Sequence, residues 1–348
     1  MHIKLKNGRV IGDNAPVYII AEIGINLNGD FKLAKKMIQD AAKTGIDAIK
    51  FQKRTIDEMY IKSFLDRPYD KDYAFGATYG EHKKFLEFTD DQFIELQKCA
   101  AKENVDFIVS GFDFTGFDFI ENQLNVNIHK IASPFVSHYP LLKHVAEYGK
   151  PIILSTGLHS KNEIFAAVNY IKQFNKEIVL LQATTLYPCP DELVNLNVLK
   201  VYRKRLKVLV GYSSHDKGVI LPAASVALGG CIIEKHFTLD RTMIGPDHAA
   251  SVEPRGLELI VNYARCLQIG LGNGRKTLCK EEKEQRTKYG VSIVTRKNLS
   301  KGQVITEEDI TIKCPGGGIS PVHFHDIIGK RTANIIPYDE IIFNEDVE

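Results

Sequence analysis

The chain has 348 residues, of which 44% are hydrophobic and 25% charged, the composition of an ordinary globular protein with room for one large domain and a small one. Its formal net charge of +2 gives no basis for a nucleic-acid or membrane partner. No stretch approaches the roughly 18 apolar residues of a membrane span, and MHIKLKNGRV at the start lacks the apolar centre of a signal peptide. The six cysteines form no CxxC pair, so we expect free thiols in a reducing cytoplasm.

Short apolar runs typical of buried parallel strands recur along the first three quarters of the chain. They lie at residues 17–21, 46–51, 105–110, 128–133, 151–156, 178–183, 208–213 and 231–237. Helix-like amphipathic stretches separate them, and the first ends at Gly45, a typical left-handed helix stop. This alternation predicts parallel pairing, and the number of strands favours a closed (β/α)8 TIM barrel over an open doubly wound sheet. No GxGxxG motif follows the first strand, which argues against dinucleotide binding.

Two regions depart from this alternation. Residues 54–88 are too long for a turn and rich in Tyr, Gly and charges, so we expect a functional lid or interface segment rather than a tolerated insertion. The periodic pattern ends near residue 272. Residues 273–289 then read as an exposed linker, and residues 290–348 as a small all-β or coil-rich domain that leans on this barrel or on a partner's.

Two histidines, His215 and His236, each close an apolar run. They therefore lie at the carboxyl ends of successive predicted strands, where barrel enzymes place their active-site residues. Neutral imidazole is a common ligand of divalent transition metals, and two imidazoles leave positions for water and substrate. We interpret the pair as metal ligands. The alternative is that each is a satisfied polar residue of the barrel rim.

Hydroxyl and ammonium groups gather at the ends of the other strands. The set comprises Lys50, Ser110, Lys130, Ser133, Ser155, Thr184, Thr185 and Ser213. Such groups converging on one rim form a site for phosphate or carboxylate, although a single Ser or Thr could simply cap the following helix. Lys50 or Lys130 could also form a Schiff base. Glu22, at the end of the first strand, could move a proton, orient a sugar hydroxyl or pair with a lysine.

A series of motifs, in order along nearly the whole chain, resembles the motifs of a known family. They are AEIGINLNGD, AIKFQK, RPYDKDYAFGATYGEHKKFLEF, HKIAS, KPIILSTG, YPCP, GYSSHD, ALGG, IIEKHFTLDR, GPDHAASVEP, PGGGISP and IIGKRTA. Together they resemble the sialic acid synthase family of nonulosonate synthases, in which a TIM barrel is followed by a small antifreeze-like (β-clip) domain. The resemblance implies domains at residues 1–272 and 290–348.

The family condenses phosphoenolpyruvate with the open-chain aldehyde of an N-acylated amino sugar, of the N-acetylmannosamine type, to a nine-carbon 2-keto acid and phosphate. The resemblance implies that His215 and His236 bind Mn²⁺ or Mg²⁺ and that Glu22 handles a proton beside them. It implies phosphoenolpyruvate contacts from Lys50, Ser110, Lys130, Ser133, Ser155, Thr185 and Ser213. It places Gln52, Tyr187, Asp247, Phe135 and Cys314 on the sugar side.

Several residues depart from the family's pattern. Leu27 stands where histidine is usual, Phe135 where an acidic residue often follows, and Cys314 where an arginine clamps the N-acyl group in some members. Thr185 replaces an asparagine or serine and keeps a hydroxyl donor. Lost charge-assisted hydrogen bonds contribute roughly 1.5–3 kcal/mol each, so we expect an altered acceptor pocket and a different or differently substituted sugar.

The resemblance also implies a homodimer in which the antifreeze-like domain covers the partner's active site, with residues 315–321 entering it. Within the family, legionaminic- or pseudaminic-type synthases and 9-phosphate synthases are close alternatives. Outside it stand a Schiff-base aldolase that uses pyruvate and a non-catalytic sugar-binding or ice-binding protein. The two histidines and the hydroxyl and lysine set argue against mere binding, which would not need them.

Overall fold

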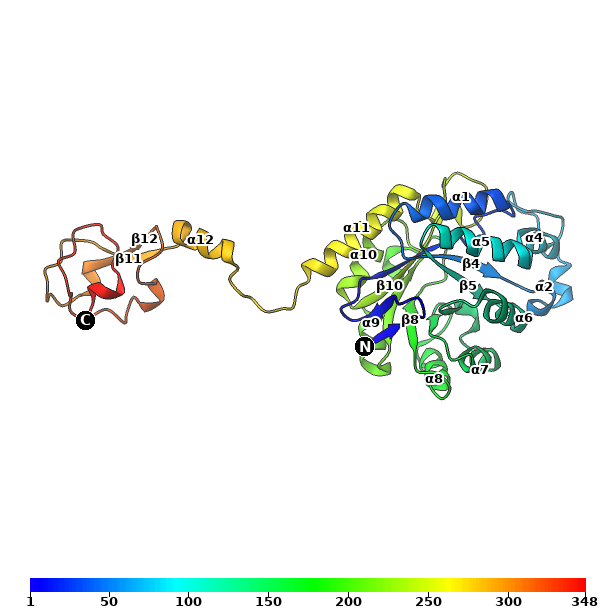
Figure 1. Cartoon of the computed structure of the whole chain (residues 1–348), viewed down its shortest axis with the longest axis horizontal. Helices are drawn as coiled ribbons and strands as arrows, with labels where there is room; N and C mark the ends of the chain where they lie inside the picture. The colour runs from blue at the N-terminus through cyan, green and yellow to red at the C-terminus, as the bar shows by residue number, and fades with distance from the viewer. The chain divides into compact units, whose positions relative to one another are not determined.

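The computed structural model describes all 348 residues, which divide into two compact units, Met1–Gly272 and Asn273–Glu348. None of its helices combines the length and the apolar character needed to cross a bilayer. Eight parallel strands of the first unit close into a barrel in the order β10-β3-β4-β5-β6-β7-β8-β9 (Figure 1). They are β3 (Tyr18–Glu22), β4 (Ala48–Lys53), β5 (Asp106–Gly111), β6 (His129–Ile131), β7 (Ile152–Ser155), β8 (Ile178–Gln182), β9 (Leu209–Ser214) and β10 (Gly230–His236). The predicted TIM barrel and its strands are confirmed.

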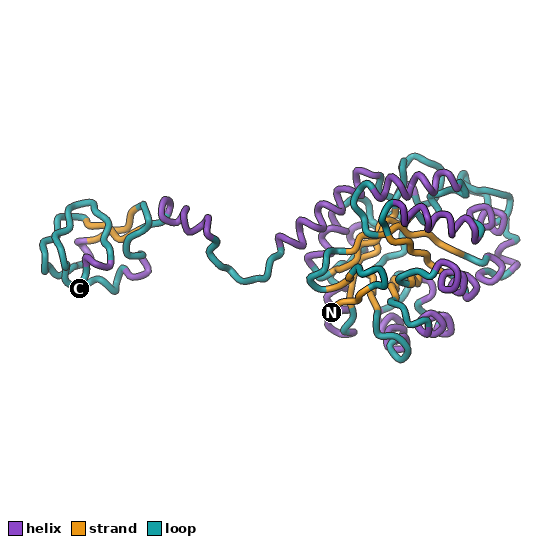
Figure 2. The backbone as a smooth tube through the Cα atoms, in the orientation of Figure 1, coloured by secondary structure: helices purple, strands orange, loops and turns teal.

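Helices surround the strands of the barrel (Figure 2). They are α1 (Phe31–Ala42), α2 (Ile56–Met59), α3 (Lys62–Leu65), α4 (Tyr79–Leu86), α5 (Asp90–Lys102), α6 (Phe114–Phe119), α7 (Tyr139–Glu147), α8 (Lys161–Ile171), α9 (Val198–Leu206), α10 (Ile220–Ala227) and α11 (Pro254–Gly270). In α1 the buried side chains recur at the spacing of one helix face, which packs against the barrel. Asp30 caps its first turn by accepting from the backbone N–H groups of Lys32 and Leu33. Gly45 follows with φ +86°, as its predicted left-handed conformation requires.

Side chains of the barrel strands alternate between its inside and its outside. Ile19 and Ala21 of β3 pack outward in the cluster under the helices, whereas Tyr18 and Ile20 belong to the smaller cluster inside the barrel. The next inward position on this strand is Glu22. The same two-residue step places polar side chains above the interior apolar layer on β4, β5, β6, β7, β9 and β10 as well. Strand periodicity thus directs the polar residues to one end of the barrel.

An amino-terminal hairpin closes the other end of the barrel. It consists of the antiparallel strands β1 (His2–Lys4) and β2 (Val10–Gly12), which the sequence analysis did not anticipate. Ile3, Leu5 and Ile11 are buried in the interior cluster of the barrel. The hairpin therefore adds apolar side chains to the barrel core from below the strands.

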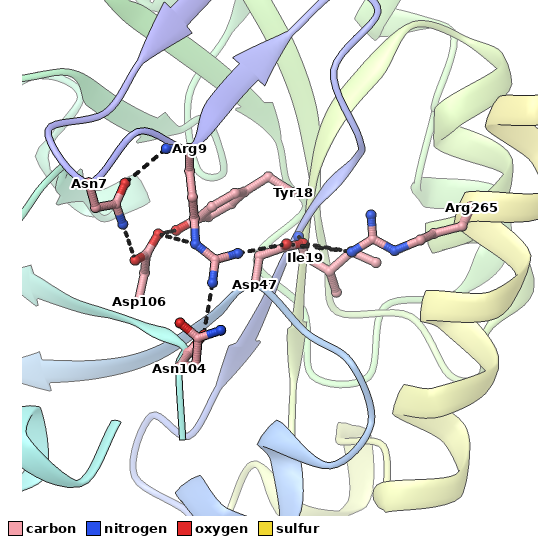
Figure 3. Close-up of polar contacts among 8 residues, drawn as sticks. All are labelled: Asn7, Arg9, Tyr18, Ile19, Asp47, Asn104, Asp106 and Arg265. Carbon is pink, nitrogen blue, oxygen red and sulfur yellow. Dashed lines mark hydrogen bonds and ion pairs between the residues drawn. The ribbon is translucent and has the colours of Figure 1, made fainter. Parts of the chain in front are cut away.

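A polar network anchors this hairpin to the barrel (Figure 3). The guanidinium of Arg9 contacts a carboxylate oxygen of Asp47 at 3.2 Å and one of Asp106 at 3.5 Å. The hydroxyl of Tyr18 donates to Asp106 at 2.6 Å, and Arg265 of α11 pairs with Asp47 at 3.2 Å. Burial raises the pKa of both carboxyl groups, so their ionised forms depend on these partners.

Replacing Arg9 by alanine is expected to lower the free energy of unfolding by about 2 kcal/mol, because Asp47 and Asp106 would keep largely buried charges with fewer partners. Urea unfolding followed by circular dichroism measures this loss. Arg255→Ala is the matched control, since Arg255 pairs with Glu258 on the exposed surface of α11 and such pairs contribute little. Equal losses in the two variants would contradict the anchoring role of Arg9.

The second unit contains the helix α12 (Lys280–Tyr289) and the antiparallel strands β11 (Ser292–Thr295) and β12 (Ile310–Lys313). Its small core is built from the buried side chains Ile293, Leu299, Ile305, Ile310, Ile319, Ile327, Ile336 and Ile342. Short 3₁₀ turns and isolated bridges make up much of the rest, which agrees with the expected small, coil-rich domain. The helix α12 lies in the segment read from the sequence as a linker and was not anticipated there.

Candidate active site

A cavity of about 240 Å³ opens at the carboxyl ends of the barrel strands. It brings together nearly all the site residues proposed from the sequence. Those that line it are Glu22, Lys50, Gln52, Ser110, Lys130, Ser133, Ser155, Thr185, Tyr187, Ser213, His215, His236 and Asp247. They come from every strand of the barrel or from the segment that follows it, because the inward positions of parallel strands converge at this end.

Four buried charges form the floor of this cavity. The ammonium of Lys50 contacts Glu22 at 2.7 Å and Glu234 at 3.6 Å. The ammonium of Lys130 lies 3.9 Å from Glu234. Both oxygens of Glu22 are engaged, one by Lys50 and the other by the amide of Gln52, whereas the Glu234 oxygen nearest Lys130 accepts no hydrogen bond. The network therefore leaves one buried acceptor oxygen, on Glu234, without a close partner.

Hydroxyl groups surround these two lysines. Lys50 donates to the hydroxyl of Ser110 at 3.1 Å, and Lys130 donates to that of Ser155 at 2.8 Å. Near them the hydroxyl of Thr185 is buried without a partner. Hydroxyl and ammonium donors around one space are the groups that bind phosphate and carboxylate oxygens.

A backbone turn adds a further donor to this group. The N–H of Gly157 donates to the hydroxyl of Ser133 at 2.9 Å. A Cβ at residue 157 would lie 2.1 Å from the hydroxyl of Thr185, so only glycine lets the backbone come this close. The turn after β7 is thus packed directly against two of the predicted phosphoenolpyruvate residues.

Burial and charge act in opposite directions on the floor residues. Burial lowers the pKa of Lys130 to about 8, with Glu234 opposing the shift. For Lys50 burial acts in the same direction, but Glu22 and Glu234 outweigh it and raise its pKa. Glu234 is buried too, and the two lysines hold its pKa below the usual range. At neutral pH the floor is therefore charged.

Two imidazoles, His215 and His236, face each other beside this floor with ring centroids 5.6 Å apart. Nδ1 of His215 lies 2.7 Å from the carbonyl oxygen of Thr184. A carbonyl only accepts, so Nδ1 carries the proton and Nε2 keeps its lone pair. Nε2 in turn lies 3.2 Å from the hydroxyl of Tyr187, and Nδ1 of His236 is buried without any partner.

These donors fit a divalent metal ion. Burial lowers the pKa of His215 and of His236 to about 3, so both rings are neutral at physiological pH, the form that binds a metal. The unpartnered ring nitrogen of His236 is a ligand atom that the protein itself leaves unused. No group of three or more His, Cys, Asp or Glu side chains gathers as a larger metal-binding cluster. Two ring nitrogens would thus be the protein's ligands.

The mouth of the cavity carries the residues expected on the sugar side. The amide of Gln52 donates to Glu22 at 2.6 Å, which links the mouth to the floor. Burial and the charge of Glu22 raise the pKa of Asp247 to about 6, against the opposing charges of Lys83 and Arg54. Asp247 therefore keeps its proton up to a higher pH than an exposed aspartate does.

Three residues singled out from the sequence, Phe135, Leu27 and Thr184, do not line the cavity. Phe135, expected to face the sugar, does not line the cavity: its ring packs edge-on against Phe112, 5.5 Å away, in the core under the helices. Leu27 is likewise buried in that core. Thr184 uses its hydroxyl to donate to the carbonyl of Leu193, so it contributes only its own carbonyl to the site. Cys314 is an exposed residue of the second unit.

The structure also adds lining residues that the sequence analysis missed. Glu234 is an inward position two residues before His236, and the alternation of β10 could have found it. Arg54 follows β4 and is buried, with its guanidinium 2.9 Å from the carboxylate of Glu87. Ile25 and Phe112 supply apolar walls. Glu234 and Arg54 make the cavity more strongly charged than the sequence suggested.

Comparison with known proteins gives the chain clear relatives. Residues 37–276 match the NeuB family, and residues 290–348 match the SAF (antifreeze-like) domain. The chain is 35% identical to N-acetylneuraminate-9-phosphate synthase of Homo sapiens, over 100% of this chain and 97% of that protein. It is 38% identical to N,N'-diacetyllegionaminic acid synthase of Campylobacter jejuni, over 93% and 98% of the two chains. The crystal structure of N-acetylneuraminic acid (sialic acid) synthetase from Leptospira borgpetersenii is similar, with 33% identity and a TM-score of 0.73 over 82% of this chain and 95% of that one.

Proposed function

Because the chain belongs to the NeuB family, we propose that it is a phosphoenolpyruvate-dependent nonulosonate synthase, a transferase of sialic-acid-type biosynthesis. It condenses phosphoenolpyruvate with the open-chain aldehyde of an N-acylated amino sugar to give a nine-carbon 2-keto sugar acid and phosphate. The observation that carries this proposal is the cavity itself. A floor of two lysines and several hydroxyls lies beside two neutral imidazoles, so the cavity offers donors for an anion next to two ring nitrogens that would hold a divalent ion.

In this proposal phosphoenolpyruvate binds to the floor. Lys50 and Lys130 neutralise its phosphate and carboxylate, and the nearby hydroxyls donate to their oxygens. Binding shares the two ammonium groups between the ligand and the carboxylates that they contact in the free protein. The floor thus fixes the enol carbon of the substrate toward the imidazoles.

His215 and His236 would hold a divalent ion, Mn²⁺ or Mg²⁺, which when bound polarises the aldehyde oxygen of the sugar. The methylene carbon of phosphoenolpyruvate then forms a carbon–carbon bond to the aldehyde carbon. The oxygen of the former aldehyde takes up a proton and becomes a hydroxyl. Water adds to the resulting cationic carbon and releases one proton; the carbon–oxygen bond to phosphate then breaks, and the added hydroxyl loses its proton to the departing phosphate as the keto group forms. Glu22, whose carboxylate lines the cavity and contacts Lys50 and Gln52, would take the proton from this water.

The acceptor is an N-acylated amino sugar held at the mouth by Gln52, Tyr187 and Asp247. We further propose a homodimer in the cytoplasm, with the antifreeze-like unit covering the partner's cavity, on the strength of the family resemblance. Gel filtration with light scattering tests the assembly, for which a purely monomeric protein is the contrary result.

The reaction is tested by incubating the protein with phosphoenolpyruvate, Mn²⁺ and a panel of N-acylated amino sugars. The expected result is stoichiometric release of phosphate and of a nine-carbon keto acid, lost on chelation and restored by Mn²⁺. No phosphate release with any acceptor would contradict the proposal. Trapping with borohydride and pyruvate distinguishes the aldolase alternative, because only a Schiff base on Lys50 or Lys130 would be reduced to a stable adduct.

A further inference from the structure

The segment between β4 and α5 ends in the helix α4, which carries Lys83. Aromatic rings hold this helix in place: Tyr79 packs edge-on against Phe64 and Tyr60, with ring centroids 4.9 and 5.5 Å apart. A capping box between Thr78 and Glu81 fixes its first turn. Lys83 is therefore presented from a folded element with its own small aromatic core.

This helix packs against the segments that form the mouth of the cavity. A Cβ on Gly29, in the turn after β3, would lie 2.7 Å from the carbonyl oxygen of Phe85, so the turn and the end of α4 are in close contact. The preceding residue in that turn, Asn28, donates to the carbonyl of Ile244 at 2.9 Å. Ile244 begins the segment that leads to Asp247, so α4 and Asp247 lie on the same side of the cavity.

The ammonium of Lys83 forms no close ion pair. No carboxylate oxygen lies within 4.0 Å of it, and its contact is the ring of Tyr79, 5.2 Å from the ammonium to the centroid. Burial and the charge of Arg54 lower its pKa to about 8, while Asp247 and Glu87 act in the opposite direction. Its neighbour Lys84, by contrast, is exposed and pairs with Asp57 at 3.0 Å.

The other cations of the cavity are already engaged. Lys50 and Lys130 contact the carboxylates of the floor, and Arg54 pairs with Glu87 and donates to Gln52. A partly buried ammonium without a partner is costly in the free protein and becomes favourable once an anion binds. The hydroxyls of a neutral sugar do not require such a cation, whereas a phosphate ester does.

We infer that Lys83 is a specificity residue for the end of the acceptor away from its aldehyde, and that this end carries a phosphate ester. The inference rests on the proposed function, because it assumes that the sugar enters with its aldehyde at the imidazoles. Lys83 does not line the cavity, but the helix that carries it contacts the turn after β3 through Phe85 and Gly29. The lysine stem is flexible, and the inference requires its ammonium to reach a phosphate bound at the mouth.

The test compares N-acetylmannosamine with its 6-phosphate, using phosphoenolpyruvate and Mn²⁺, in the wild type, Lys83→Met, Lys83→Arg and Lys84→Met. The wild type is expected to have the higher kcat/KM for the phosphorylated sugar. Lys83→Met is expected to shrink this preference about 10- to 100-fold, the effect of losing one charge-assisted hydrogen bond. Lys83→Arg keeps the cation and should keep most of the preference, and Lys84→Met should leave it unchanged.

A wild type that prefers the free sugar, or treats both alike, overturns the inference while leaving the proposed function intact. A preference that survives in Lys83→Met overturns the role of Lys83. If neither sugar is turned over, the proposed reaction fails with these acceptors, and calorimetric binding of the two sugars to the Mn²⁺-loaded protein decides the inference. Equal affinities would then refute it, and a preference for the phosphate that Lys83→Met removes would support it.

Discussion

Replacing His236 by alanine is expected to lower turnover by roughly three orders of magnitude or more, because polarisation of a carbonyl by a metal ion contributes several kcal/mol to the transition state. The protein should still fold. Nδ1 of His236 makes no hydrogen bond in the free protein, so its loss leaves no new unpaired polar group behind. The effect should therefore appear in metal binding and catalysis rather than in stability.

Mn²⁺ binding measured by electron paramagnetic resonance distinguishes the loss of a metal ligand from a loss of stability. The alanine variant should bind Mn²⁺ far more weakly than the wild type, with an unchanged circular dichroism spectrum. His144→Ala is the matched control, since His144 lies on α7 and pairs with Asp118 at 2.7 Å, outside the cavity. Unaltered Mn²⁺ affinity in the His236 variant would refute the assignment of this residue as a ligand.

Replacing Lys130 by methionine is expected to lower kcat/KM for phosphoenolpyruvate about 100-fold. The ammonium is fully buried between Ser155 and Glu234, and a charge-assisted contact to a phosphate or carboxylate contributes roughly 1.5–3 kcal/mol. Removing it also leaves Glu234 with one cation fewer, which repels an anionic substrate. Steady-state kinetics with varied phosphoenolpyruvate measures the loss.

The pH dependence gives an independent readout of Lys130. Its pKa is lowered to about 8, so the side chain is cationic below that pH and neutral above it. In the wild type, kcat/KM for phosphoenolpyruvate should therefore fall as the pH rises through about 8, and this limb should vanish in Lys130→Met. Lys53→Met is the control, because Lys53 also ends a strand but pairs with Asp90 outside the barrel. A wild-type profile that stays flat up to pH 9 would speak against a substrate-binding ammonium.

Much of the barrel could be predicted because its strands carry the signal themselves. Runs such as CII, which leads toward His236, place apolar residues on both faces of the strand, as expected for a parallel strand covered by helices. The inward positions at the strand ends then follow from a two-residue period. Glu234 obeys this period and could have been identified by counting back from His236; it was missed because the analysis looked only at the ends of the apolar runs.

Other features depend on contacts that a single sequence does not reveal. The strands of the amino-terminal hairpin have three residues each, too few for a pattern, and Arg9 meets Asp47 and Asp106 only through the tertiary fold. Phe135 was placed by its position in a motif. Phe135 lies in a short 3₁₀ turn that directs its ring toward Phe112. No local sequence pattern predicts that turn.

The pairing of β10 with β3 has a consequence for synthesis on the ribosome. Tyr18 finds its partner Ile232 only after almost the whole barrel has emerged from the exit tunnel. Until then both borders of the growing sheet expose unpaired backbone groups, which readily recruit strands from other nascent chains. The interval before ring closure is thus the stage of synthesis at which this polypeptide exposes the most unpaired strand edge, and a slower passage of the ribosome through that stretch would lengthen it.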